Sequence, residues 1–229
     1  MIIMKLSEET LSTLKNFASI NANIVMNPGN VVKTMSESKT IMGQATIAES
    51  IPNQFGIYDL NEFLGVVNMF DDPTLEFDPN MKFVNVREGN KSVKYFFSDA
   101  SILTTPTKDI VMPPCEVNFT LTSSDMANIR KASSALGVTD LVVSIKPNTA
   151  PMLIVTDTED ATSNTYEVAL TEYSAAGVDC RFVFNIGNFK FVNEDYQVSI
   201  SSKLLSNFKS LTSSTEYWVA LEKKSTFGG

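Results

Sequence analysis

The side chains that most often perform catalysis are scarce in this chain. It contains no histidine and only two cysteines, Cys115 and Cys180. The lack of histidine excludes Ser-His-Asp and Cys-His catalysis, histidine-ligated zinc and histidine-based acid–base chemistry. Two cysteines are too few for the common structural zinc sites. We therefore expect no bound metal and no cofactor, and we predict that the protein is not an enzyme.

One acidic run, Asp157-Thr-Glu159-Asp160, is the best candidate for a cation site, because carboxylates are ligands that divalent cations prefer. The run lacks the glycine and the terminal glutamate of a calcium-binding loop. A solvated hairpin turn is therefore the favoured interpretation. A metal-dependent nuclease is the alternative that this run leaves open.

Hydrophobic residues make up 43% of the 229-residue chain and charged residues 19%, which is typical of a globular protein. No apolar run approaches the ~20 residues that span a bilayer, and no basic segment precedes a long apolar core at the N-terminus. We expect no membrane association and a cytoplasmic location. In that compartment the two cysteines are expected to be free, buried thiols.

The net charge of −8 argues against nucleic-acid binding, because phosphate binding is driven by basic surface. A net charge is a sum, however, and the 18 Lys and Arg residues can still gather on one face. Five of them fall on or beside predicted helices, off the apolar stripes. The alternative is that they are ordinary solvated residues, since surface helices usually carry lysine. The five are Lys5, Lys15, Arg130, Lys131 and Lys190.

An amphipathic helix is predicted over Met4 to Asn21. Ser7 is a suitable N-cap, and Glu8 and Glu9 follow in the first turn, where the helix dipole favours negative charge. One side carries an apolar stripe at helical spacing, and the other side carries mostly small polar residues. The stripe consists of Leu11, Leu14, Phe17 and Ala18, and the polar side of Ser12, Lys15, Asn16 and Ser19.

Three further helices are predicted. Asp59 with Glu62 forms a capping-box pattern ahead of a second apolar stripe. In the second half, a helix follows a cap at residues 122–124 and ends at Gly137. A short fourth helix begins at Asn185. Strands are predicted at 24–26, 31–32, 35–50, 55–58, 74–77, 81–87, 92–97, 116–121, 141–145, 153–156, 165–170, 181–184, 196–200, 204–211 and 216–221, and residues 223–229 are expected to form a loose tail.

The two halves of the chain align without gaps over these helices. Lys15 matches Arg130, and Asp59 matches Asn185. Each half therefore consists of a helix, strands, a second helix and more strands. The predicted fold class is α+β, with two similar domains that each place two helices on one face of an antiparallel sheet. The proline-containing segment between the halves predicts domains at 1–103 and 115–229, joined by an interdomain linker at 104–114.

Two of these stretches give the chain a family resemblance. Met4-Lys-Leu-Ser, followed by Leu14-Lys-Asn-Phe-Ala-Ser-Ile-Asn21, and Ile57-Tyr-Asp-Leu-Asn-Glu-Phe-Leu-Gly65 resemble the sliding clamps of T-even-type bacteriophages, which are DNA polymerase processivity factors. The likeness extends more loosely over the whole chain, including its ending Tyr217-Trp-Val-Ala-Leu-Glu222. The sequence departs from the family in carrying Met1-Ile2-Ile3 ahead of the usual start.

The resemblance implies a homotrimeric ring, with two similar sliding-clamp-type domains in each subunit. Helices would line the hole and sheets would form the outside. The implied partners are double-stranded DNA bound without sequence preference, the replicative DNA polymerase, an ATP-dependent clamp loader and late transcription factors. The implied location is the cytoplasm of the infected bacterial host. The five basic residues would then point into one channel, and changing Lys15 and Arg130 to Glu would reduce processive synthesis.

Clamps of this kind bind short peptides of their partners in an apolar pocket on the outer face. Apolar residues in and near the linker are therefore candidates for partner binding. The alternative is that they pack on their own domains. A different function, that of a virion structural protein, also fits an acidic, repeated, strand-rich chain. The candidates for partner binding are Ile102, Leu103, Ile110, Val111 and Phe227.

Overall fold

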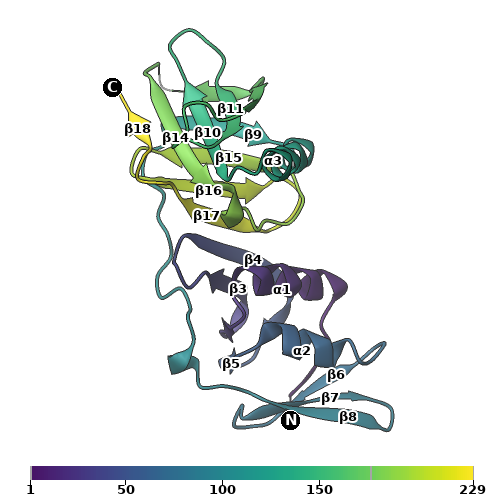
Figure 1. The fold of residues 1–229 in the computed structure, drawn as a ribbon. Coiled ribbons are helices and arrows are strands. Elements are labelled where there is room, and N and C mark those ends of the chain that lie inside the picture. Colours follow the sequence, from purple (N-terminus) through teal and green to yellow (C-terminus); the bar gives the residue numbers. More distant parts are fainter. Residues whose placement is uncertain (1, 176, 229) are drawn as a thin grey trace. The chain divides into compact units, whose positions relative to one another are not determined.

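The computed structural model describes residues 2–175 and 177–228. The chain divides into two compact units, Met1–Asp109 and Ile110–Gly229 (Figure 1). The division falls inside the segment 104–114 that the sequence analysis treats as a linker.

The first unit combines two helices with antiparallel strands. One sheet has the strand order β1-β6-β7-β8, while β2 pairs with β5 and β3 forms a hairpin with β4. In chain order the elements are β1 (Ile2–Met4), α1 (Glu8–Ile20), β2 (Ile24–Met26), β3 (Gly29–Met35), β4 (Ile41–Ile51), β5 (Phe55–Ile57), α2 (Leu60–Val67), β6 (Thr74–Phe77), β7 (Phe83–Glu88), β8 (Lys91–Phe96) and the 3₁₀ turn η1 (Ala100–Ile102).

The second unit repeats this order of elements around a single α-helix. Its strands β12, β11, β10, β14 and β18 are neighbours in that order, and so are β13, β9, β15, β16 and β17. The elements are β9 (Val117–Leu121), α3 (Ser123–Leu136), β10 (Asp140–Ile145), β11 (Met152–Thr156), β12 (Tyr166–Ala169), β13 (Tyr173–Ala175), β14 (Cys180–Asn185), the 3₁₀ turn η2 (Ile186–Asn188), β15 (Tyr196–Ser201), β16 (Leu205–Ser210), β17 (Glu216–Ala220) and β18 (Thr226–Phe227).

The predicted internal repeat and the α+β class are confirmed. In both units a strand before the first helix pairs with the strand that follows the second helical element: β1 pairs with β6, and β9 pairs with β15. The backbone N–H of Leu60 at the start of α2 donates to Ala22, and that of Ile186 at the start of η2 donates to Thr139. Corresponding elements therefore meet through corresponding hydrogen bonds.

The predicted helix caps are also confirmed, although α1 begins only at Glu8 and Met4 of the predicted helical stretch lies in β1. The Ser7 side chain accepts the Thr10 N–H at the start of α1, and Asp59 caps α2. Thr122 caps α3 in a reciprocal capping box with Asp125. Gly137 ends α3 at a φ of 69°, in the left-handed region that glycine enters without steric cost.

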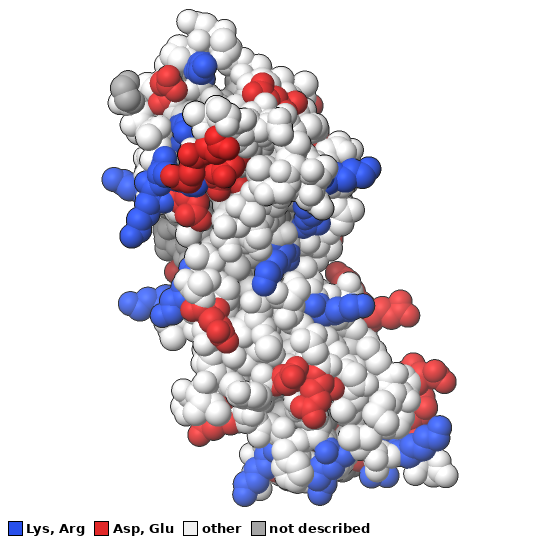
Figure 2. Space-filling view, in the orientation of Figure 1, with Lys and Arg blue, Asp and Glu red and all other residues white. Residues whose placement is uncertain are grey.

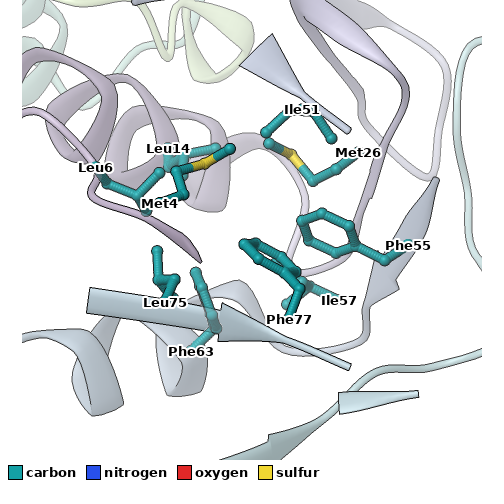
Figure 3. A pocket seen from close by; sticks show the side chains of 10 residues that line it. All are labelled: Met4, Leu6, Leu14, Met26, Ile51, Phe55, Ile57, Phe63, Leu75 and Phe77. Atoms are coloured by element: carbon teal, nitrogen blue, oxygen red, sulfur yellow. The ribbon is translucent and has the colours of Figure 1, made fainter. Parts of the chain in front are cut away.

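The core of the first unit lies where α1, α2, β5 and β6 meet. Leu14 from α1, Phe63 from α2 and Phe77 from β6 converge there (Figure 3). A void of about 10 Å³ is left among the ten apolar side chains that surround it. A buried water needs two or more polar partners, so this void is a dry packing gap.

The expected fourth helix is wrong, because only a three-residue 3₁₀ turn, η2, forms at Ile186–Asn188. The α2 stripe of Leu60, Phe63, Leu64 and Val67 has no counterpart after η2. Phe191 follows Phe189 by two residues, and its ring stacks on Tyr217 at 4.8 Å between centroids. The irregular segment 189–192 brings both aromatic side chains to the core, so Lys190 lies on this irregular segment and not on a helix.

The expected loose tail at 223–229 is also wrong for most of its length. Thr226 and Phe227 form β18, which pairs with Arg181 and Cys180 of β14. Lys224 Nζ lies 2.8 Å from Asp140 Oδ2. Burial raises the pKa of Asp140, but hydrogen bonds from Lys224 and Thr158 outweigh it and hold that pKa below its ordinary value.

We predict that Asp140→Asn lowers the free energy of unfolding at neutral pH by about 2 kcal/mol, because a charged hydrogen-bond acceptor is lost. A lowered pKa in the folded state means that the carboxylate stabilises the fold above the unfolded pKa and loses this effect as the pH falls. The difference from wild type should therefore shrink below pH 3.8, the ordinary aspartate value. Urea denaturation over a pH series measures it.

The control is Asp71→Asn, at an exposed position in the first unit. Its unfolding free energy should follow that of wild type at every pH. A loss in Asp140→Asn that does not change with pH would contradict the assigned role of the Asp140 carboxylate.

Candidate nucleic-acid interface

Helix α1 buries its apolar stripe and exposes a small polar face. Leu14 and Phe17 are fully buried, whereas Ser12, Lys15 and Ser19 are exposed. Leu11 of the predicted stripe is only half-buried. The polar face therefore presents Lys15 with short neighbours around it.

Glu49 of β4 fixes the start of this helix. It accepts hydrogen bonds from the Ser7 backbone N–H and from the Thr10 hydroxyl. Burial raises the pKa of Glu49, but these hydrogen bonds prevail and hold the pKa below its ordinary value. The carboxylate also lies at the positive end of the helix dipole, which further favours its charged form.

An open groove runs between α1 and α2, with a volume of about 480 Å³. We call it the α1–α2 groove. Lys15 is the only charged side chain in its lining. The lining residues are Leu11, Ser12 and Lys15 from α1 and Asn61, Leu64, Gly65 and Asn68 from α2 and its C-cap.

Helix α3 has the same division into two faces. Met126 and Ile129 are buried against the strands of the second unit. The exposed face carries one lysine, Lys131, among small residues. The exposed set is Ser124, Ala127, Asn128, Lys131, Ser134 and Ala135.

Arg130 differs from Lys15 although the two occupy matching helix positions. Its Nη2 donates to the carbonyl oxygens of Phe189 at 2.7 Å and Phe191 at 3.4 Å. Lys15 is exposed, whereas Arg130 is half-buried. Arg130 therefore ties α3 to the irregular segment 189–192, which stands in place of a second helix in this unit.

The structure places the remaining predicted basic residues in two groups. In the second unit, Lys131 is exposed and follows Arg130 in the chain. Lys190 is also exposed and follows Phe189, whose carbonyl oxygen accepts a hydrogen bond from Arg130. In the first unit, Lys5 lies ahead of α1 and forms an ion pair with Asp72. Figure 2 shows Lys and Arg scattered over the visible face among Asp and Glu, without one continuous basic patch.

The sequence analysis missed the contribution of α2 to the groove around Lys15. Asn61, Gly65 and Asn68 are spaced by four and three residues and lie beside the apolar stripe of the same helix, next to Leu64. That spacing was the available signal, and the lack of charge on these residues hid it.

The predicted partner-binding residues differ widely in exposure. Val111 is 86% exposed and Ile102 69%, Phe227 is exposed on the edge strand β18, and Ile110 is half-buried. Leu103 is only 8% exposed. A side chain added at Gly56 would lie 2.7 Å from Leu103 Cδ1, so Leu103 packs closely against β5 of its own unit.

Two carboxylates of the acidic run between β11 and β12 accept hydrogen bonds within local turns. Asp157 accepts the Glu159 N–H, and Asp160 accepts the N–H and hydroxyl of Thr162. Within residues 2–175 and 177–228, no group of three or more Cys, Asp or Glu residues is arranged to hold a metal ion. Both cysteines are free, as predicted, although only Cys180 is buried.

None of the described helices combines the length and apolar character needed to cross a membrane.

We predict that Arg130→Gln lowers the free energy of unfolding by about 2 kcal/mol, because two buried carbonyls lose a charged donor. The matched control is Lys131→Gln, which removes the same charge from the neighbouring, exposed position. Its unfolding free energy should stay within about 0.5 kcal/mol of wild type. Urea denaturation at one fixed protein concentration measures both, and equal effects would contradict the structural role of Arg130.

Comparison with known proteins agrees with this geometry. The model of the DNA polymerase processivity factor family matches residues 7–101, and the model of the C-terminal domain of the gp45 sliding clamp matches residues 118–223. The sliding clamp of Vibrio phage KVP40 is 32% identical over 96% of this chain and 99% of its own length. The sliding clamp of Enterobacteria phage T4 is 27% identical, over 97% of this chain and 99% of its own.

Solved structures extend the likeness of fold beyond phages. The Archaeoglobus fulgidus PCNA bound to the C-terminal region of FEN-1 superposes with a TM-score of 0.71 at 12% identity, covering 99% of this chain and all of its own. A PCNA2–PCNA3 complex from Sulfolobus tokodaii gives a TM-score of 0.68 at 13% identity, over 96% of this chain and 99% of its own. The chain therefore belongs to the sliding clamps of T4-type bacteriophages, the family of DNA polymerase processivity factors.

Proposed function

We propose that three copies of this chain close into a ring around duplex DNA and hold the replicative DNA polymerase on its template. The observation that carries this proposal is the pair of small polar helix faces that each expose one lysine. Lys15 on α1 and Lys131 on α3 are both exposed among short side chains. The helices line the channel in this proposal, and the sheets form the outer wall.

A clamp has to attract DNA without gripping it, because it must slide. Lysine ammonium groups attract phosphates without reading the base sequence. Few such contacts keep the attraction weak, since each neutralised phosphate adds to affinity and to its salt dependence. The short neighbours Ser12 and Ser19 on α1, and Ser134 and Ala135 on α3, let the duplex come close without offering long side chains to the grooves.

Two edge strands with side chains of opposite charge are available to join neighbouring subunits in the proposed ring. Strand β8 ends the order β1-β6-β7-β8, carries Lys91 and Lys94, and exposes Phe96. Strand β12 is an edge strand of the sheet β12-β11-β10-β14-β18 in the second unit and carries Glu167. Unpaired edges can extend a sheet into a second chain. Two different edges that meet head to tail form a ring when the rotation closes.

The wider partner set follows from membership of the family. We propose that an ATP-dependent clamp loader opens and closes the ring, and that late transcription factors of the phage use it as well. Peptides of these partners dock on apolar residues beside and within the linker and at the C-terminal end, namely the exposed Ile102, Val111 and Phe227 and the half-buried Ile110. The protein performs no catalysis of its own and acts in the cytoplasm of the infected bacterium.

We predict that the double variant Lys15→Glu, Lys131→Glu shortens the products of processive synthesis to nearly those made without clamp, since repulsion replaces attraction in the channel. Its fold should be retained because both side chains are exposed. The measurement is product length on primed template with polymerase and loader at moderate salt. Arg130 is left unchanged because it carries a structural hydrogen bond.

The matched control is Lys39→Glu, Lys146→Glu, which reverses one exposed lysine in each unit, in both cases outside the helices. It should support products of wild-type length. Products of wild-type length from the Lys15, Lys131 double variant would contradict the assignment of these two lysines to the DNA channel.

We predict that Phe96→Glu raises the dissociation constant between subunits by about tenfold or more, which corresponds to about 1.4 kcal/mol. A charge placed on the β8 edge removes an apolar contact and faces the acidic β12 edge. Sedimentation equilibrium should show a shift toward the 25.2 kDa monomer. Met69→Glu is the control, because Met69 is also 67% exposed but lies after α2, away from any strand edge. A trimer as stable as wild type in Phe96→Glu would rule out the β8 edge.

A further inference from the structure

Strand β1 of the first unit has an open edge at a place where the second unit has a further strand. The helix caps Ser7 and Thr122 are 115 residues apart, and the same offset places β1 on β9. Strand β9 is paired on both sides, with β15 and with β13. Among the described strands, β1 pairs only with β6 and ends the order β1-β6-β7-β8. One side of β1 therefore lacks the partner that its counterpart has.

The first unit supplies no strand of its own for this edge. In the second unit the chain leaves β12 and forms β13, which pairs with β9 ahead of β14. In the first unit β4 precedes β5 in the same way, but β4 continues to Ile51, which pairs with Gly29 of β3. The strand that would cover β1 is therefore used elsewhere in the sheet.

The open edge leaves apolar side chains of β1 exposed. Val117 and Phe119 of β9 are only 0% and 3% exposed. Ile2, at the place of Val117, is 38% exposed, and Met4, at the place of Phe119, is half-buried, although it points into the core of its unit (Figure 3). Ile3 is 55% exposed. Edge strands are commonly protected by charged residues or proline, and the two isoleucines give β1 no such protection.

The backbone of Ile3 and Lys5 directs hydrogen-bonding groups to the open side. In antiparallel sheets, successive residues of a strand bond to alternate neighbours. The Thr120 N–H, at the place of Lys5, donates to the Glu172 carbonyl oxygen next to β13. Lys5 and Ile3 therefore turn their N–H and C=O groups away from β6. Lys5 also places a positive charge at this edge, where its ion pair with the exposed Asp72 stays open to solvent.

We propose that the open edge of β1 binds an extended segment of a partner protein as an added antiparallel strand. The segment carries an acidic residue opposite Lys5 and an apolar, β-branched residue two positions later, opposite Ile3. The residues on either side of this apolar residue cover Met4 and Ile2. Backbone hydrogen bonds provide the affinity, and the side chains in these positions provide the selectivity.

The second unit supports both the register and the chemistry of this occupant. There, Glu172 lies opposite Thr120, and Ser174 lies opposite Asn118. An acidic residue thus already precedes the covering strand at the position that would face Lys5, where opposite charges attract. Ile3 replaces Asn118 in the first unit, so an apolar residue is favoured over serine at the facing position. The site lies at the other end of the sheet from β8 and does not depend on the proposed ring.

The test uses the full chain labelled with ¹⁵N and a capped pentapeptide, Thr-Glu-Tyr-Val-Ala. This is the sequence of residues 171–175, which covers β9, with valine in place of serine. Amide chemical shifts in NMR report binding. We expect the largest shifts at Ile3 and Lys5 and none along β8.

Two N-methylated peptides test whether the contact is an added strand. Methylation at the valine nitrogen removes the N–H that pairs with Ile3 and should weaken binding about tenfold, as expected for a lost hydrogen bond. Methylation at the tyrosine nitrogen is the matched control, because that N–H points away from β1 and binding should be unchanged. Equal binding of the two methylated peptides would overturn the proposal.

Variants of the protein test the same contact from the other side. Ile3→Pro removes an N–H that faces away from β6, so the sheet should form while the peptide no longer binds. Ile3→Thr keeps the N–H and should retain binding. Lys5→Glu should weaken binding of the parent peptide, and a peptide with lysine in place of glutamate should restore it.

Two further results would overturn the proposal. Peptide-induced shifts confined to other strands would show that the β1 edge is not the site. Shifts of Ile3 and Lys5 that depend on protein concentration without peptide would show that a second copy of this chain occupies the edge. Neither result involves DNA or processive synthesis, so the proposed function stands or fails by its own test.

Discussion

The burial of one apolar stripe on each helix decides which side chains the protein can offer to DNA. On α1 the burial of Leu14 and Phe17 leaves Ser12, Lys15 and Ser19 exposed, together with Glu8 and Glu9 in the first turn. On α3 the burial of Met126 and Ile129 leaves Lys131 between small residues. A helix cannot rotate without exposing that stripe, and each large apolar side chain exposed costs about 1.5–3 kcal/mol. The orientation of the lysines therefore follows from the core, not from any contact that they make themselves.

The two units fill the space beside their first helix with different elements. In the first unit, α1 packs beside helix α2, and the apolar stripe of α2 fills part of the core of this unit. The second unit has only η2 there, and an aromatic cluster that includes Phe189, Phe191 and Tyr217 takes over the packing. The irregular segment 189–192 leaves backbone carbonyls without helical partners, and Arg130 donates to two of them. The arginine at the position of Lys15 is thus a consequence of the missing helix.

This divergence explains how far sequence could predict the fold. Helix positions, caps and the repeat follow from local patterns, and Ser7, Asp59, Thr122 and Gly137 behave as their residue types predict. The absence of a fourth helix depends on where Phe191 finds aromatic partners, and these come from strands distant in sequence. The ordered C-terminal segment likewise depends on Asp140, more than eighty residues before Lys224. Such long-range partners are not contained in a local pattern.

The candidate site was predictable in part for the same reason. Lys15 and Lys131 fall off the apolar stripes, and helical spacing alone places them on the outside. The half-buried state of Arg130 and the burial of Leu103 depend on tertiary contacts that spacing does not reveal. Gly65 was overlooked because its contribution is an empty space.

An overall charge of −8 is compatible with DNA binding once distance is considered. At physiological salt, exposed charges separated by more than about 8 Å are largely screened. In the proposed channel, a phosphate near Lys15 would therefore be governed by that lysine, and more distant carboxylates would contribute little. In the proposed ring, those carboxylates would disfavour nonspecific binding of DNA to the outer surface. The acidic composition is thus compatible with the proposed function, in which attraction to DNA is confined to the helix faces that expose Lys15 and Lys131.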